Sequence, residues 1–151
     1  MYIIKSPLEI PYAFSKKKNK EVLFHLNLNV YRNKHYRVLN LAKIEYKERL
    51  KGAINSLPVF DRLAILYEVH MKSKRAFDVS NVGSIHSKFF LDALTELGKI
   101  KDDNYNFIPI ECYTFGEVDK DNPRVDIYLF DLSNQEDRCI FMRMIGGKIG
   151  A

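Results

Sequence analysis

The chain has 151 residues, of which 46% are hydrophobic and 28% charged, and its formal net charge is +5. This composition is typical of a globular chain able to bury a core, so we expect a single domain over residues 1–151. No apolar run approaches the roughly 20 residues that a membrane helix needs, and no signal-peptide-like stretch begins the chain, which predicts no membrane association and a cytoplasmic location.

The N-terminal half predicts one strand and one helix. Residues 1–20 show no clear period and end in a basic run, so we expect an N-terminal extension there. Hydrophobic and polar side chains then alternate over residues 22–28, which is typical of a strand. A polar, basic loop over 29–37 leads to a helix over 40–56, where apolar side chains recur at helical spacing.

The C-terminal half predicts three more strands and a second helix. The expected elements are a strand over 62–71, a helix from about 77 to Gly98, and strands over 108–115 and 125–132. Turn residues at 119–123 join the last two strands, as in a hairpin. The tail, 133–151, is expected as a C-terminal extension whose segment 139–145 forms either a short helix or a strand. This order predicts the α/β (α+β) class, with a small mixed β-sheet and two main helices packed on it.

Opposite charges gather in two parts of the chain. Residues 14–51 hold eleven Lys or Arg against three Asp or Glu, a balance of +8, whereas residues 100–137 hold three against ten, a balance of −7. A basic region suits a phosphate backbone, and an acidic region either suits divalent cations or forms a solvated face. Cys112 and Cys139 lack the spacing of metal ligands and the four histidines are scattered, so the sequence predicts free thiols and no zinc site.

Carboxylates stand at three places around the second predicted helix. Asp78 precedes the helix, Asp92 lies within it, and Asp102 and Asp103 follow it. If they converge, their oxygens would bind Mg²⁺ or Mn²⁺, which can polarise a phosphate and activate a water. A helix of roughly 17 residues spans about 25 Å, so convergence requires the chain to fold back. The alternatives are a helix cap for Asp78, an ordinary turn for Asp102 and Asp103, and a surface pair of Asp92 with Lys88.

The same stretch carries an ordered set of motif residues. It reads Lys74-Arg75-Ala-Phe-Asp78-Val-Ser80-Asn81, then Lys88, Asp92-Ala-Leu94, Gly98 and Asp102-Asp103. This order resembles the signature of the RusA family of Holliday-junction resolvases, which are phage-type crossover junction endodeoxyribonucleases. The resemblance covers about residues 22–132. Two departures are Ser80 in place of a family Asp and four extra residues between Asn81 and Lys88.

The resemblance implies a homodimeric, metal-dependent endonuclease that resolves four-way DNA junctions by paired nicks during recombination and repair, in the host-cell cytoplasm if phage-encoded. With Mg²⁺ or Mn²⁺ as cofactor, the implied metal ligands are Asp78, Asp102, Asp103 and Asp92, and Lys88 would contact the reacting phosphate. The implied DNA-backbone contacts are Lys72, Lys74, Arg75, Arg32 and Lys34. Because Ser80 removes one metal ligand, the alternative is a catalytically silent junction- or DNA-binding protein on the same fold.

Overall fold

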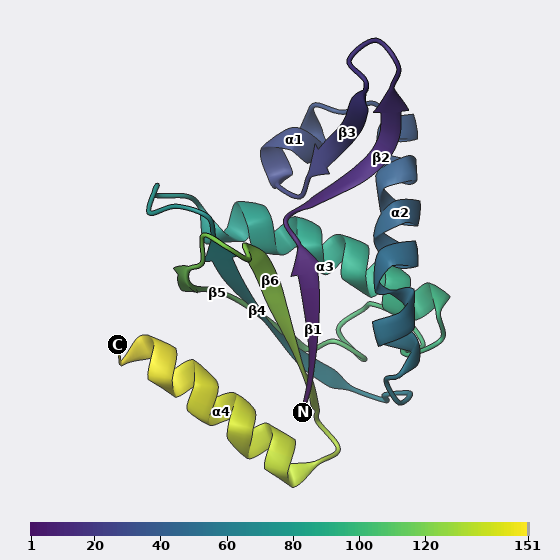
Figure 1. Ribbon diagram of the computed structural model, residues 1–151. Helices are drawn as coiled ribbons and strands as arrows, with labels where there is room; N and C mark the ends of the chain where they lie inside the picture. The colour runs from purple at the N-terminus through teal and green to yellow at the C-terminus, as the bar shows by residue number, and fades with distance from the viewer. Residues whose placement is uncertain (151) are drawn as a thin grey trace.

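The computed structural model describes residues 1–150, in which a four-stranded sheet has the order β1–β6–β4–β5 (Figure 1). Its strands are β1 (Tyr2–Pro7), β4 (Leu63–Met71), β5 (Ile110–Val118) and β6 (Arg124–Asp131). β4 is parallel to β5 and antiparallel to β6, and β6 is antiparallel to β1. A separate hairpin consists of β2 (Glu9–Ser15) and β3 (Lys20–His25). The predicted mixed sheet with packed helices is confirmed.

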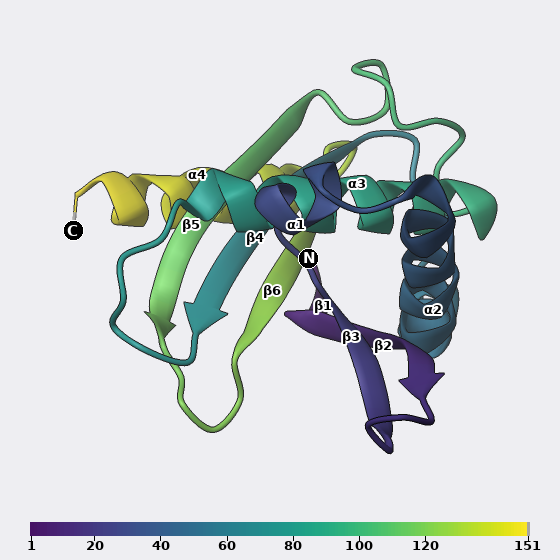
Figure 2. The same ribbon diagram turned by 90° about the horizontal axis from the view of Figure 1, so that it is seen from above.

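Helices cover both faces of this sheet (Figures 1 and 2). They are α1 (Leu28–Arg32), α2 (Tyr36–Asn55), α3 (Val79–Glu96) and α4 (Gln135–Ile149). Successive strand residues point to opposite faces. Ile65 of β4 belongs to the larger core with residues of α2 and α3, whereas the next residue, Leu66, packs in a smaller cluster with Phe141 of α4. The face that carries α3 is therefore opposite to the face that carries α4.

The two long helices confirm the helical spacing seen in the sequence. α2 begins at Tyr36, somewhat before the expected start, and His35 caps it by accepting a hydrogen bond from a backbone N–H. α3 begins after Asp78 and ends before Gly98, whose φ of 70° is a conformation that glycine adopts without steric penalty. The loop expected over 29–37 is shorter, because α1 occupies Leu28–Arg32 and α2 begins at Tyr36.

Residues 1–20 are not an extension, because they supply two strands. β1 pairs with β6 along its whole length, and its Ile4 is buried in the larger core. The other buried position of β1 holds Ser6, which is hydrogen bonded to Tyr46 of α2. A six-residue strand whose two buried positions are one apolar and one polar residue gives only a weak apolar period in the sequence.

β5 and β6 do not form the expected hairpin, because β4 lies between them. α3 connects β4 to β5 as parallel neighbours, which requires a long crossover. β6 then pairs with the other edge of β4. The connection at 119–123 passes the end of β4, where the backbone N–H of Asp119 donates to the carbonyl of Met71 at 2.9 Å. The turn residues predicted the reversal correctly, but not which strand receives the returning chain.

The C-terminal tail forms the helical alternative, α4, and packs on the sheet. Asn134 caps the helix, and the N-terminal ammonium of Met1 bonds to Asp137 in its first turn at 2.6 Å. Phe141 contacts Phe130 of β6, with ring centroids 5.1 Å apart. Among the helices of residues 1–150, none is long and apolar enough to cross a membrane.

Candidate functional site

Asp78 is the exposed N-cap residue of α3. Its Oδ1 accepts hydrogen bonds from the backbone N–H of Ser80 at 2.9 Å and from the Ser80 hydroxyl at 2.8 Å. These bonds, the hydroxyl first, hold the pKa of Asp78 below its usual value because they stabilise the charged carboxylate. The helix-cap interpretation is therefore confirmed, and Asp78 is ionised at neutral pH.

A cleft of about 490 Å³ opens beside Asp78. Arg75 and Asp78 line it from the segment between β4 and α3, Asn81 from the first turn of α3, and Asn27 and Asn29 from the start of α1. Apolar side chains form most of the remaining wall. A carboxylate, a guanidinium and three amides around an open cleft can bind a phosphate group together with a cation.

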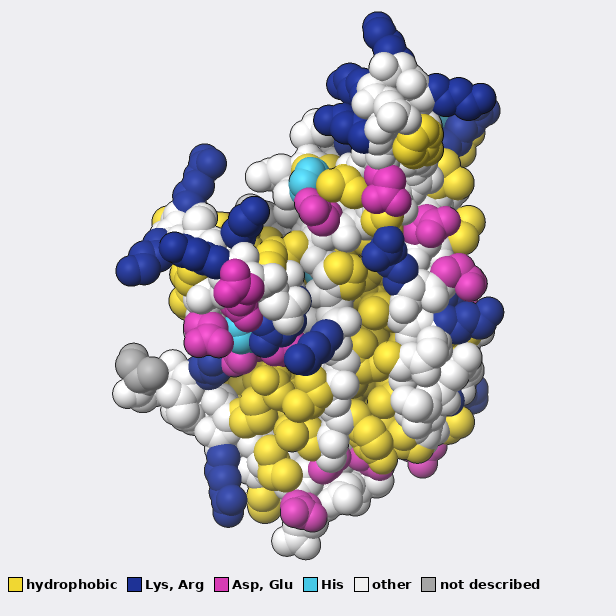
Figure 3. All heavy atoms as spheres, viewed as in Figure 1, with side chains coloured by type: hydrophobic (Ala, Val, Ile, Leu, Met, Phe, Trp, Pro, Cys, Tyr) yellow, Lys and Arg dark blue, Asp and Glu magenta, His cyan; other side chains and the backbone are white. Residues whose placement is uncertain are grey.

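Basic side chains occur on or next to the two segments that line this cleft, although only Arg75 is part of its lining. All five predicted DNA contacts are exposed: Lys72, Lys74 and Arg75 in the loop after β4, Arg32 in the last turn of α1, and Lys34 just beyond it. Figure 3 shows Lys and Arg side chains around that loop and at the tip of the β2–β3 hairpin, where the basic run 16–20 lies. Their repeated positive charge suits a polyanion that crosses the cleft.

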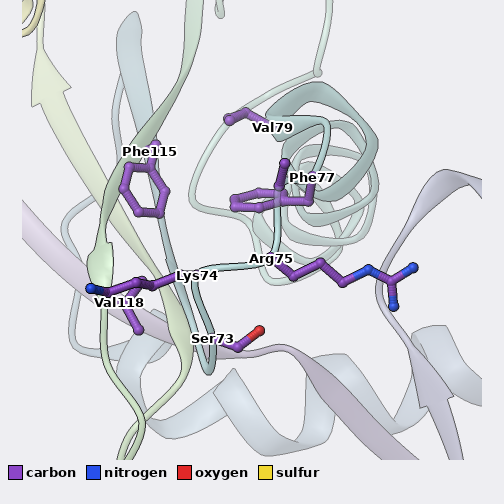
Figure 4. Close-up of a pocket in the computed structure, with 8 residues that line it drawn as sticks. Ser73, Lys74, Arg75, Phe77, Val79, Phe115 and Val118 are labelled. Atoms are coloured by element: carbon purple, nitrogen blue, oxygen red, sulfur yellow. The ribbon is translucent and has the colours of Figure 1, made fainter.

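The loop after β4 is anchored by an aromatic contact. Phe77 packs against Phe115 of β5, with ring centroids 6.0 Å apart (Figure 4). Lys74 and Arg75 extend in opposite directions from this anchored loop (Figure 4). Arg75 lines the cleft beside Asp78, whereas Lys74 does not. The loop therefore presents positive charge on two sides.

Asp92 and Lys88, the predicted helix pair, have separate surroundings. Asp92 accepts a hydrogen bond from Lys43 of α2 at 2.5 Å, so it links two helices instead of lining the cleft. Lys88 is exposed near the middle of α3. It lies about 15 Å along the helix from Asp78 at 1.5 Å per residue, which is farther than a lysine side chain extends.

Asp102 and Asp103 lie in the exposed loop beyond the other end of α3. Asp102 accepts hydrogen bonds from the backbone N–H of Asp103 at 2.8 Å and from the Asn104 amide at 2.6 Å, as in a turn. α3 has 18 residues and is therefore about 27 Å long. The expected gathering of these carboxylates with Asp78 does not occur within one chain, because the unbroken helix keeps them at opposite ends.

A different cluster, which the sequence did not reveal, lies on the α4 face of the sheet. Glu68 and His70 belong to β4, and Asp126 of β6 stands opposite Glu68. The His70 Nε2 atom lies 3.3 Å from Glu68 Oε1 and 3.2 Å from Asp126 Oδ2. His70 is 4% exposed and Asp126 is 6% exposed. Among residues 1–150, this is the one group of His, Cys, Asp and Glu side chains arranged so that it could hold a metal ion.

Positive side chains balance this cluster. Arg124 donates to both oxygens of Asp126, at 2.8 and 3.0 Å. Lys148, near the end of α4, forms an ion pair with Glu68 Oε2 at 2.5 Å. Burial, and then the charges of Glu68 and Asp126, raise the pKa of the neighbouring Tyr128. The cluster is thus an electrostatic unit that joins β4, β6 and α4.

Only part of this cluster has a signal in the sequence. Glu68 and His70 stand two positions apart in a predicted strand, so they share one face of it. The place of Asp126 depends on the register between β4 and β6. That register is a property of the folded sheet, and neither strand encodes it alone.

In comparisons with known proteins, neither a family model nor a curated protein matches the chain. The resemblance to RusA-type resolvases therefore rests on the motif residues themselves. Of these, Arg75, Asp78 and Asn81 lie around one cleft, whereas Asp102 and Asp103 lie at the far end of α3.

Proposed function

We propose that the protein is a divalent-metal-dependent endonuclease that cleaves branched DNA, resolving four-way junctions by paired nicks. The observation that carries this proposal is the cleft in which the ionised Asp78 lies beside Arg75 and Asn81. A lone carboxylate repels DNA. A carboxylate beside a guanidinium can hold a phosphate when a cation bridges the carboxylate and the phosphate and the guanidinium binds the same phosphate. The exposed basic loops on both sides supply the attraction for the DNA backbone.

Each residue of the cleft has a role that its contacts support. Asp78 uses Oδ1 for both hydrogen bonds to Ser80, which leaves Oδ2 for a cation. Mg²⁺ in such sites takes one or two carboxylates and completes its coordination with water and substrate phosphates, which suits an open cleft. When bound, Mg²⁺ or Mn²⁺ supplies a polarised phosphate and a water of lowered pKa. Arg75 of the cleft, together with Lys72 of the same loop outside the cleft, holds backbone phosphates without reading bases.

Asp102 and Asp103 enter the proposal through a second copy of the chain. A two-fold dimer could bring the C-terminal end of α3 in one copy to the N-terminal end of α3 in the other. These carboxylates would then join Asp78 of the partner copy, and the symmetry would create the composite site twice. Two sites related by a two-fold axis suit the paired nicks of a four-way junction. Lys88, exposed near the middle of α3, would contact DNA between them.

The direct test is incubation of the wild type with a synthetic four-way junction in Mg²⁺, in Mn²⁺ and in chelator. We expect symmetric nicks with either metal and intact junction with chelator. Asp78→Asn and Asp103→Asn should each abolish nicking and keep junction binding, because each removes a carboxylate from the same composite site. If either variant cuts at the wild-type rate, the assignment of these residues is wrong.

Mixing the two inactive variants tests the composite site. A mixed dimer of Asp78→Asn with Asp103→Asn contains one site with both substitutions and one site with neither. We therefore expect the mixture to regain single nicks, although each variant alone is inactive. If the mixture stays inactive while subunit exchange is verified, the two carboxylates do not act together across the dimer.

A second candidate is a junction-binding protein that does not cut. It is favoured by one observation: among residues 1–150, Asp78 is the only carboxylate in the lining of the cleft, and Ser80 holds one of its oxygens. Binding of four-way junctions without nicks in any metal would support this candidate. Ser80→Asp, which introduces a second carboxylate beside Asp78, should then create cleavage.

A further inference from the structure

We propose that Glu68, His70 and Asp126 form a site for one divalent cation of the zinc class, on the face of the sheet opposite the Asp78 cleft. The site goes beyond the proposed nuclease function, because none of its residues lines the cleft. One imidazole nitrogen and two carboxylate oxygens make a mixed donor set. Such a set suits Zn²⁺ better than Mg²⁺, which prefers oxygen ligands alone.

The spacing of the donor atoms fits tetrahedral coordination. Bonds of about 2.0–2.2 Å to Zn²⁺ place two tetrahedral ligands about 3.3–3.6 Å apart. His70 Nε2 lies 3.3 Å from Glu68 Oε1 and 3.2 Å from Asp126 Oδ2. The three donor atoms lie within 4.8 Å of one another. The two separations that involve His70 therefore match those around a tetrahedral zinc ion, whose fourth position would be left for a water.

The imidazole of His70 supplies an independent indication of a ligand. Its side chain is 6% exposed, and both of its ring nitrogens are buried without a hydrogen-bond partner in the structure. Nε2 is close to two carboxylate oxygens, yet it forms a hydrogen bond with neither. Buried polar atoms nearly always have a partner, because an unpaired one has lost its hydration without compensation. A cation shared by the three side chains would satisfy this nitrogen.

The backbone of β5 approaches the His70 ring closely on one side. Gly116 of β5 packs directly on it: a Cβ at Gly116 would lie 2.5 Å from His70 Cε1 and 2.8 Å from Glu68 Cγ. Any side chain at position 116 would therefore displace the imidazole or the carboxylate arm. Thr114, which is opposite Glu68 in the β4–β5 register, also has a buried hydroxyl without a partner.

The two basic neighbours affect the carboxylates differently, because Arg124 orients Asp126 whereas Lys148 places a positive charge beside Glu68 that opposes a cation. Lys148 pairs with Glu68 Oε2, whereas Oε1 is the oxygen nearest His70. Arg124 donates to both oxygens of Asp126 and so fixes the orientation of that carboxylate, as supporting groups do around protein metal ligands. Each carboxylate oxygen can accept more than one contact, so Asp126 Oδ2 can serve both Arg124 and a cation.

Metal binding is tested directly on the purified full chain, without reference to DNA cleavage. Titration with Zn²⁺ should show one ion per chain, and substitution by Co²⁺ should give the intense visible absorption of tetrahedral cobalt. His70→Gln should weaken binding by more than the roughly 10- to 100-fold that loss of a supporting group causes. The matched control is His25→Gln, because His25 is an exposed histidine whose Nδ1 lies 3.2 Å from Glu9 in another pair of strands. This control should bind zinc as the wild type does.

A second variant decides between a metal site and an ion-pair network. Lys148 is partly exposed, so Lys148→Met should fold, and circular dichroism checks this. If the cluster is a metal site, removing the competing ammonium should tighten zinc binding several-fold and increase the rise in melting temperature on adding zinc. Absence of stoichiometric zinc binding by both the wild type and Lys148→Met would overturn the proposal. Equal affinities of wild type and a folded His70→Gln would overturn it as well.

Discussion

The Asp78 cleft and the His70 cluster lie near the same end of β4, on opposite faces of the sheet, and they handle charge differently. In the cleft, the carboxylate is exposed and is kept ionised by neutral donors of Ser80. In the cluster, both carboxylates are largely buried, and each is paired with a basic side chain. The first arrangement is open to exchange with solvent, and the second is closed.

This difference separates function from stability. An exposed carboxylate keeps its hydration and can accept a cation that arrives with a substrate. A buried charge has lost its hydration and depends on its neighbours, so removal of one partner is strongly destabilising. Substitutions in the cleft should therefore change activity without changing stability, and substitutions in the cluster should do the reverse.

The largest effect is expected at the cleft. Asp78→Asn should reduce junction cleavage by at least about 100-fold, the scale for losing a group that stabilises charge in the transition state. Its melting temperature should stay close to that of the wild type, because Asn caps a helix about as well as Asp. Gel assays of nicked junctions and thermal melts measure the two quantities. A large drop in the melting temperature of Asp78→Asn would show that Asp78 contributes to stability, as the residues of the His70 cluster are expected to do.

The cluster should show the converse. Asp126→Ala removes the carboxylate that Arg124 and His70 share, although Arg124 keeps its ion pair with Asp119 and His70 stays beside Glu68, and should lower the free energy of unfolding by about 1–3 kcal/mol. Urea denaturation measures this change. Cleavage per folded molecule should stay at the wild-type level, because Asp126 does not line the cleft. A stability equal to that of the wild type would contradict the interpretation of the cluster as a buried, interdependent unit.

His86 on the α3 side is a buried histidine without charged partners, which sharpens the comparison with His70. Its contacts include the Ser6 hydroxyl at 2.9 Å and the Tyr46 ring, and burial lowers its pKa to about 3. Between about pH 6.5 and 3, the unfolded chain binds a proton at this residue and the folded chain does not. Stability should therefore fall by roughly 1.4 kcal/mol for each pH unit of acidification in that window.

The measurement for His86 is urea denaturation of wild type and His86→Leu at pH 7, 6 and 5. The variant lacks the titrating group, so the stability difference between the two proteins should shift in favour of the variant as the pH falls. A difference that is independent of pH would show that His86 is protonated in the folded protein or exposed to solvent.

The smallest effect is expected at Asp92, which the sequence predicted as a metal ligand. Its contact with Lys43 is a partly exposed ion pair, and both side chains are 32% exposed. Asp92→Asn should therefore lower stability by less than about 1 kcal/mol. Junction cleavage should not change, because Asp92 is outside the cleft. If Asp92→Asn loses as much cleavage activity as Asp78→Asn, Asp92 takes part in catalysis and its assignment to a surface ion pair is wrong.

Local sequence patterns determined the individual elements around the candidate sites. Alternation over Leu63–Met71 predicted β4, and helical spacing predicted α2 and α3 with few residues of error. Asp78 as a cap and Gly98 as a helix end were predictable for the same reason. Each of these features depends on side chains within a few positions along the chain, so a single segment carries the information.

The grouping of the site residues was decided by tertiary structure alone. An unbroken α3 keeps Asp78 and Asp103 apart within one chain, and the position of β4 between β5 and β6 places Asp126 beside His70. β1, at the N-terminal end of the chain, forms an edge of the sheet by pairing with β6, which lies near the C-terminal end. Strand order and register follow from which faces can be buried together, and that depends on every packed element at once. For this reason the sequence singled out Asp78 and Asp103, which lie apart in one chain, and missed the grouping of Glu68 and Asp126 around His70.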